Sequence, residues 1–307
     1  MLNRPCQTTL RASVAIEGIG LHGGHAVTAT LYPAPSGFGV RFRRTDIAGR
    51  DGYVPARWDL VSDTMLCTRL RNAAGVEVAT VEHLMAAFHA LGVDNVLVEV
   101  DDAELPVLDG SAGPWVAAID RVGIRTLGTE LRMLRILEPV RVEDGDRSVA
   151  LLPWPAGSGR SGLRVEMDIA FDDPAIGRQA CTFDVDSRSF RFGLAAARTF
   201  CLARDVTRMR SAGLALGGSL DNAVVVEDGS VLNPGGLRFE DEFVRHKALD
   251  VVGDLALAGA PVIGRYVGVK AGHALNNRLL RALFARPEAW CLEAAETPAE
   301  RFAVAGA

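Results

Sequence analysis

Two side chains that bind metals or transfer protons lie four residues apart in the apolar segment 245–254. They are His246 and Asp250, and Asp254 follows after four more residues. On an α-helix, residues at this spacing lie on one face a turn apart, so both side chains can reach one point. The segment therefore favours either a metal site or a hydrogen-bonded His–Asp pair at the edge of a buried helix, because a buried carboxylate needs a partner.

A second segment, 80–92, places a glutamate directly before a histidine at the start of an expected helix. Thr80 is expected to cap this helix and Gly92 to end it. Adjacent helical residues point about 100° apart, so Glu82 and His83 cannot ligate one ion in the same way. His83 can bind a metal while Glu82 faces a water molecule beside it. A metallohydrolase needs this division of roles.

Taken together, the two segments supply the ligand set of a catalytic zinc ion. His83, His246 and Asp250 offer two imidazoles and one carboxylate, which leaves one position open for water. Glu82 would accept a proton from that water, and His273, at the start of the last expected helix, would donate a proton or stabilise charge. The same ligands also suit Fe²⁺.

Other polar residues are more ambiguous. His22 and His25 have the spacing of a metal pair, but the two glycines between them fix no geometry. We expect loop histidines there, with a substrate contact left open for His22. Asp109 is either a turn carboxylate or a supporting partner of a site. Cys67 is expected to be a small buried residue and not a nucleophile.

Lysine is rare in this chain. Only Lys247 and Lys270 among the 33 basic residues are lysines, and both lie near a histidine motif. Arginine and lysine differ where a compact ammonium group must meet a phosphate or a tight pocket. The two lysines are therefore predicted to contact a substrate, with chance as the alternative.

Composition restricts the class of protein. The 307 residues carry a net charge of −5, with 49% hydrophobic residues and five scattered cysteines. The acidic balance argues against a general nucleic-acid binder, and unpaired cysteines suit a reducing compartment. The sequence has no apolar run long enough to span a membrane and no signal-peptide pattern. We expect a cytoplasmic protein without a membrane span, and a monomer.

Hydrophobic patterning predicts mixed helices and strands in two units. The likeliest boundary is 123–134, where the pattern restarts, so we predict domains at 1–126 and 132–307. An apolar insert near 200–226 would either line an apolar channel or pack into the core. The expected strands cover 8–16, 27–32, 37–44, 96–100, 135–142, 148–152, 163–171 and 261–269, and the expected helices cover 114–122 and 187–196, besides those already named.

Five motifs, in one order along the chain, resemble a known family. They are Thr80–His83, Leu108–Ser111, Arg198–Phe200, Phe239–Lys247 with Asp250, and Lys270–Asn277. Together they resemble the UDP-3-O-acyl-N-acetylglucosamine deacetylases of lipid A biosynthesis, from Thr9 to about Trp290. The resemblance implies an α+β fold of two similar two-layer domains. The helices would lie between two sheets, with zinc at the domain interface.

The resemblance also assigns roles to residues. It implies that His83, His246 and Asp250 hold the zinc and that Glu82 is the general base. Thr199 would help to hold the oxyanion, and Asp254 would orient His273. Lys247, Phe200 and Asp109 would contact or support the substrate. Met85 and Gly23 depart from the family, where asparagine and threonine are frequent.

The implied reaction is zinc-dependent hydrolysis of the N-acetyl group of UDP-3-O-(3-hydroxyacyl)-N-acetylglucosamine, which releases acetate. The insert near 200–226 would then receive the acyl chain. Two alternatives stay open: an amidohydrolase acting on another sugar nucleotide, and a catalytically silent nucleotide-binding or structural-zinc protein. The sequence leaves the choice between zinc and iron and the length of the acyl chain undetermined.

Overall fold

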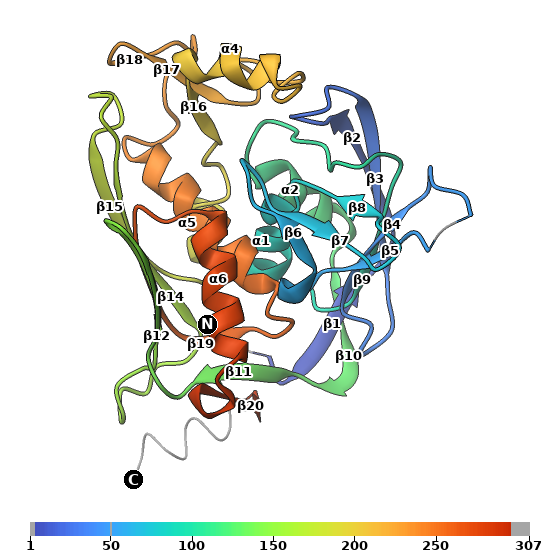
Figure 1. The fold of residues 1–307 in the computed structure, drawn as a ribbon. Helices are drawn as coiled ribbons and strands as arrows, with labels where there is room; N and C mark the ends of the chain where they lie inside the picture. Colours follow the sequence, from blue (N-terminus) through green and yellow to red (C-terminus); the bar gives the residue numbers. More distant parts are fainter. Residues whose placement is uncertain (1–3, 50, 296–307) are drawn as a thin grey trace.

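Two β-sheets face each other across a layer of helices (Figure 1). The computed structural model describes residues 4–49 and 51–295. One sheet has the strand order β2-β3-β9-β4-β5, and the other has the order β12-β13-β19-β11-β20, with β14 and β15 joined to β19. This arrangement confirms the α+β fold with helices between two sheets.

The five-stranded sheet comes from the first half of the chain. Its strands alternate between buried and more exposed residues, as expected when only one face packs on a core. Two helices of the same half, α1 and α2, join the central layer. The elements are β2 (Val14–Ile19), β3 (Ala26–Pro33), β4 (Val40–Arg44), β5 (Tyr53–Pro55), β9 (Val96–Val100), α1 (Glu82–Leu91) and α2 (Gly113–Val122).

The seven-stranded sheet comes from the second half. Its central strand β19 pairs with β13 on one side and runs parallel to β11 and β14. The strands are β11 (Arg132–Ile136), β12 (Val140–Asp144), β13 (Arg147–Leu152), β14 (Leu163–Ala170), β15 (Arg178–Asp184), β19 (Val262–Val269) and β20 (Trp290–Ala294). The helices are α3 (Ser187–Gly193), α5 (Glu242–Ala256) and α6 (His273–Phe284).

Smaller elements complete the fold at its edges. The strand β1 (Cys6–Leu10) pairs with β10 (Ile124–Glu130), and β6, β7 and β8 form a three-stranded sheet. The insert forms α4 (Ala203–Ser211) and a third small sheet, at the top of Figure 1. The remaining bounds are β6 (Val61–Asp63), β7 (Arg69–Arg71), β8 (Glu77–Val78), β16 (Phe200–Leu202), β17 (Val224–Glu227), β18 (Ser230–Val231), and the 3-10 turns Trp58–Leu60 and Pro287–Ala289.

Several sequence-based boundaries were wrong. The expected strand 8–16 is two strands, β1 and β2, which belong to different sheets. Thr80 does not cap α1: its backbone has a positive φ of 58°, and its hydroxyl donates to Glu104 Oε1 at 2.9 Å. Val81 is the N-cap residue instead. Gly92 ends the helix as predicted, with φ 74° and ψ 45°.

The segment 123–134 is not a simple linker, because it forms β10 and the start of β11. The division into domains 1–126 and 132–307 stays a prediction. The first residues of the predicted first domain, 1–3, and the last residues of the predicted second domain, 296–307, lie outside the described part of the chain. Among the described residues, no helix combines the length and the hydropathy needed to cross a membrane.

The helices α1 and α5 pack closely in the central layer. Gly253 makes this contact possible: a Cβ atom at that position would lie 2.0 Å from the carbonyl oxygen of Glu82. Since that distance is far below van der Waals contact, only glycine allows the two helices to approach so closely. The approach brings the Glu82–His83 segment beside the His246–Asp254 face.

Candidate metal and active site

Three predicted ligands converge between α1 and α5. Donor atoms of His83, His246 and Asp250 all lie within 4.8 Å of one another, and all three residues are buried. The Nε2 atoms of His83 and His246 lie 3.7 and 3.4 Å from Asp250 Oδ1. His246 and Asp250 lie on one face of α5, as their spacing predicted, and His83 meets them from a distant segment.

The ring of His246 is held in the form that binds metals. Its Nδ1 atom lies 3.1 Å from the Ala197 carbonyl oxygen, which can only accept a hydrogen bond. Nδ1 is therefore the protonated nitrogen, and Nε2 directs its lone pair towards Asp250. Burial lowers the pKa of His246 to about 4, which keeps the ring neutral at physiological pH.

The carboxylate of Asp250 has one oxygen available for a metal. Its Oδ2 accepts a hydrogen bond from Lys247 Nζ at 2.7 Å, whereas Oδ1 is buried without a hydrogen-bond partner among the described residues. A buried unpaired carboxylate oxygen is costly. Together with two imidazoles, this oxygen fits the donor set of a divalent metal ion. The residues present therefore fit a metal.

Glu82 lies in the first turn of α1, beside this group. Its Oε2 accepts a hydrogen bond from the backbone N–H of Thr68 at 3.0 Å, and its Oε1 lies 4.0 Å from His273 Nε2. Burial raises the pKa of Glu82, and this effect outweighs the opposing influence of the nearby histidines. A carboxylate with a raised pKa is suited to accept and return a proton near neutral pH.

His273 begins α6 and faces Asp250 and Asp254 of α5. Its Nδ1 lies 2.8 Å from Asp254 Oδ2, and its Nε2 lies 3.9 Å from Asp250 Oδ2. Burial opposes a charge on this ring, but the nearby carboxylates of Asp254, Asp250 and Glu82 together outweigh it and raise the pKa of His273 to about 9. The ring is therefore protonated at neutral pH and can donate a proton.

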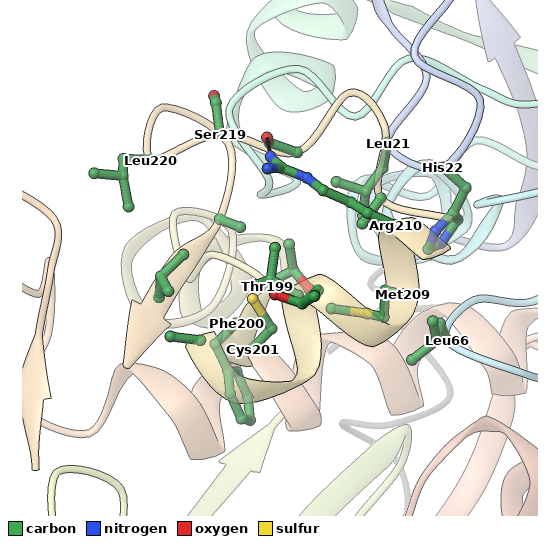
Figure 2. Close-up of a pocket in the computed structure, with 17 residues that line it drawn as sticks. Leu21, His22, Leu66, Thr199, Phe200, Cys201, Met209, Arg210, Ser219 and Leu220 are labelled. Carbon is green, nitrogen blue, oxygen red and sulfur yellow. Dashed lines mark hydrogen bonds between the residues drawn. The ribbon is translucent and has the colours of Figure 1, made fainter. Parts of the chain in front are cut away.

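An apolar cavity of about 350 Å³ lies near the predicted metal ligands, although none of the three lines it. Figure 2 shows Thr199, Phe200 and His22 on its wall, together with Met209 from α4. The ring of Phe200 links the cavity to the ligand group, because its centroid is 6.3 Å from that of His246. The insert, expected either to line a channel or to pack into the core, contributes residues to the wall of this cavity.

His22 lines this cavity with neither ring nitrogen hydrogen-bonded within the described residues. The side chain is only 7% exposed, and burial lowers its pKa. Its backbone is fixed, since the N–H groups of His22 and Gly23 donate to Glu104 at 2.9–3.0 Å. A buried ring with two free nitrogens is suited to meet a polar group of a ligand. His25 instead faces Asp102 at 2.9 Å and is exposed.

Three further predicted site residues form ion pairs with other side chains. Lys247 pairs with Asp250, and Lys270 pairs with Asp146 in the turn between β12 and β13. Asp109 accepts hydrogen bonds from Ser111 and from Arg238, the latter at 2.9 Å. None of the three lines the apolar cavity. Their substrate contacts stay predictions.

Comparison with known proteins places the chain in a family. Residues 7–285 match the family described as UDP-3-O-acyl N-acetylglycosamine deacetylase. The chain belongs to this family. A relative named UDP-3-O-acyl-N-acetylglucosamine deacetylase from Phenylobacterium zucineum is 48% identical over 92% of this chain and 95% of its own length. A relative of the same name from Shewanella woodyi is 44% identical over 98% of both chains. The resemblance seen in the sequence is confirmed.

The sequence does not reveal which residues hold the site in place. The Arg198 guanidinium, 7% exposed, binds the fully buried carboxylate of Glu242 at 2.8 Å and so fixes the backbone directly before Thr199. Thr68, Glu104 and Asn276 also bind site residues or their loops. The partner of each lies in a distant segment that sequence spacing does not reveal.

Proposed function

We propose that this protein is a metal-dependent deacetylase that hydrolyses the N-acetyl group of UDP-3-O-(3-hydroxyacyl)-N-acetylglucosamine and releases acetate. The observation that carries the proposal is the buried His83–His246–Asp250 group with Glu82 beside it and an apolar cavity adjoining it. Family membership supports the same activity, since the relatives carry this name. The metal is zinc, with Fe²⁺ as the alternative that suits the same ligands.

His83, His246 and Asp250 would hold the metal. When bound, a divalent ion supplies a Lewis acid that polarises the amide carbonyl and lowers the pKa of water. Glu82 accepts a proton from the water that attacks the carbonyl carbon. The buried site excludes other water, which strengthens every charge interaction within it.

The remaining steps stabilise the negative charge on the carbonyl oxygen and supply a proton to the departing amine. The carbonyl oxygen becomes negative as water adds, and the hydroxyl of Thr199 donates a hydrogen bond to it. The carbon–nitrogen bond then breaks, and protonated His273 gives its proton to the departing amine. Asp254 holds His273 through Nδ1, so that Nε2 faces Glu82 and Asp250. Transfer of the proton from Glu82 to His273 then restores both side chains, so that one water and one amide yield acetate and a protonated amine.

The apolar cavity would receive the acyl chain, and polar residues around it would bind the rest of the substrate. Phe200 lies between the cavity and His246, where the acylated sugar would pass. We propose substrate contacts for His22, Lys247, Lys270 and Asp109 as well. The monomeric state and the cytoplasmic location stay predictions of the sequence.

Purified protein with measured metal content tests the function. We expect turnover of the acylated UDP-sugar with stoichiometric acetate, loss of turnover on chelation, and recovery when Zn²⁺ or Fe²⁺ returns. Glu82→Gln should retain the metal and lose most turnover. Equal turnover of UDP-N-acetylglucosamine without an acyl chain would favour another amidohydrolase. A metal-loaded protein without any turnover would favour the catalytically silent class.

A further inference from the structure

Thr68 touches two of the proposed catalytic side chains at once. Its backbone N–H donates to Glu82 Oε2 at 3.0 Å, and its hydroxyl donates to Asp254 Oδ1 at 2.6 Å. The residue is only 2% exposed and lies just before β7, outside both helices that carry the catalytic groups. It therefore joins the proposed base to the partner of the proposed acid.

Asp254 is held by three side chains, one from the segment before β7 and two from α6. Oδ1 accepts a hydrogen bond from Thr68, and Oδ2 accepts hydrogen bonds from His273 and from Asn276, both at 2.8 Å. Asn276 is itself fixed, because its Oδ1 accepts a hydrogen bond from the Tyr266 hydroxyl at 2.7 Å. These contacts define the plane of the Asp254 carboxylate, and that plane sets the direction of the His273 ring.

We propose that Thr68 is a positioning residue that aligns Glu82 with His273 through Asp254. This inference rests on the proposed function. Without the hydroxyl, Asp254 Oδ1 would be a buried oxygen with no donor, and the carboxylate would turn towards another group. The ring of His273 would follow, so that its Nε2 atom no longer faces the departing nitrogen. Binding of the substrate does not depend on this alignment.

The variant Thr68→Val removes the hydroxyl and keeps both the shape of the side chain and the backbone N–H. We expect kcat to fall about 10- to 100-fold, as for loss of a hydrogen bond to a charged group, with KM within about twofold. Metal content should not change, since Thr68 contacts none of the three ligands. Thr68→Ser keeps the hydroxyl and should restore most of the lost kcat.

Thr9→Val is the matched control. Thr9 lies in β1 and is fully buried. Its hydroxyl donates a hydrogen bond to the Asn95 carbonyl oxygen at 2.7 Å. This variant loses that hydrogen bond and a second one, which the hydroxyl accepts from the Ala34 N–H at 2.9 Å, and it should still keep the wild-type kcat. If lost stability were the cause, kcat would fall to a similar extent in Thr68→Val and in Thr9→Val. Thermal unfolding of both variants shows whether each is folded at the assay temperature.

A double-mutant cycle tests the route through Asp254. In an Asp254→Asn background, Thr68→Val should change kcat by less than about threefold, because the positioned carboxylate is already gone. The Nδ1–H proton signal of His273 in NMR spectra should move in Thr68→Val and stay in place in Thr9→Val. An unchanged kcat in Thr68→Val, or full additivity in the cycle, overturns the inference. Absence of turnover in the wild-type protein overturns the proposed function instead.

Discussion

At the scale of single residues, Thr199 combines a backbone fixed by hydrogen bonds with a hydroxyl that is available to a ligand. Its N–H donates to the Gly110 carbonyl, and its own carbonyl accepts from the Val224 N–H, both at 2.8 Å. In the described part of the chain its hydroxyl forms no hydrogen bond, and the residue lines the cavity. The donor is thus held in place before a substrate arrives, as electrostatic stabilisation of an oxyanion requires.

Thr199→Val should lower kcat about 100- to 1,000-fold, the range for loss of one oxyanion donor, with little change in KM. The reason is that the hydrogen bond strengthens only as negative charge develops on the carbonyl oxygen. Steady-state kinetics at constant metal content measures the effect. Thr199→Ser, which keeps the donor, is the control. Equal losses in both variants would contradict the role.

His89, near the end of α1, makes stability depend on pH. Burial lowers its pKa to about 4, below the 6.5 of an unfolded chain. Below pH 6.5 the unfolded state takes up a proton that the folded state does not, so stability falls as pH falls and the loss is complete below pH 4.

Chemical denaturation at pH 7.5 and at pH 5 tests this effect of His89. At pH 5 the wild-type protein should have lost about 1–2 kcal/mol of unfolding free energy through this residue. His89→Gln cannot take up the proton, so its unfolding free energy should decrease by about 1–2 kcal/mol less than that of the wild-type protein over the same pH interval. The same decrease in both proteins would show that other groups account for the acid sensitivity.

At the scale of elements, Glu104 joins the loop 20–25 to the start of α1. It is 5% exposed, and it accepts hydrogen bonds from His22, Gly23 and Thr80. Because Thr80 directly precedes the helix start, the same carboxylate fixes both the wall of the cavity and the approach to Glu82. A loop with three glycines would otherwise have many conformations.

Glu104→Gln should therefore weaken the placement of His22. An amide accepts with one oxygen only, so at least one of the three donors loses its partner. We expect KM for the acylated UDP-sugar to rise about 3- to 30-fold, with a smaller change in kcat, since hydrogen bonds to a charged group contribute about 1.5–3 kcal/mol. Glu99→Gln, at an exposed ion pair of β9, is the control and should leave KM unchanged.

The elements also show what a sequence can predict. The four-residue spacing of His246 and Asp250 depends only on helix geometry, and it placed both ligands on one face. The strand 96–100 was found because its pattern is local. The break between β1 and β2 was missed, since both segments contain β-branched residues and only their pairing in different sheets separates them. The positive φ of Thr80 was missed because a tertiary contact with Glu104 imposes it.

At the scale of the whole molecule, the candidate site exists only because the two halves of the chain pack together. α1 from the first half carries Glu82 and His83, and α5 from the second carries His246 and Asp250. Gly253 lets the helices approach closely enough for the ligands to meet. No local pattern predicts such a contact, although the need for a third ligand implied that one exists. The apolar cavity arises in the same way, because loops of the first half close against the insert of the second.

The shape of this cavity should set which acyl chains are accepted. Met209 of α4 lines the cavity, as Figure 2 shows, and a larger side chain there would fill part of its volume. Each methylene that can no longer be buried removes about 0.8 kcal/mol of binding. Met209→Trp should therefore raise KM for a substrate with a long acyl chain about tenfold or more, and leave a short-chain substrate little affected. Met65→Trp is the control, since Met65 is 61% exposed and does not line the cavity. If Met209→Trp shifts KM equally for long and short chains, the acyl chain does not occupy this cavity.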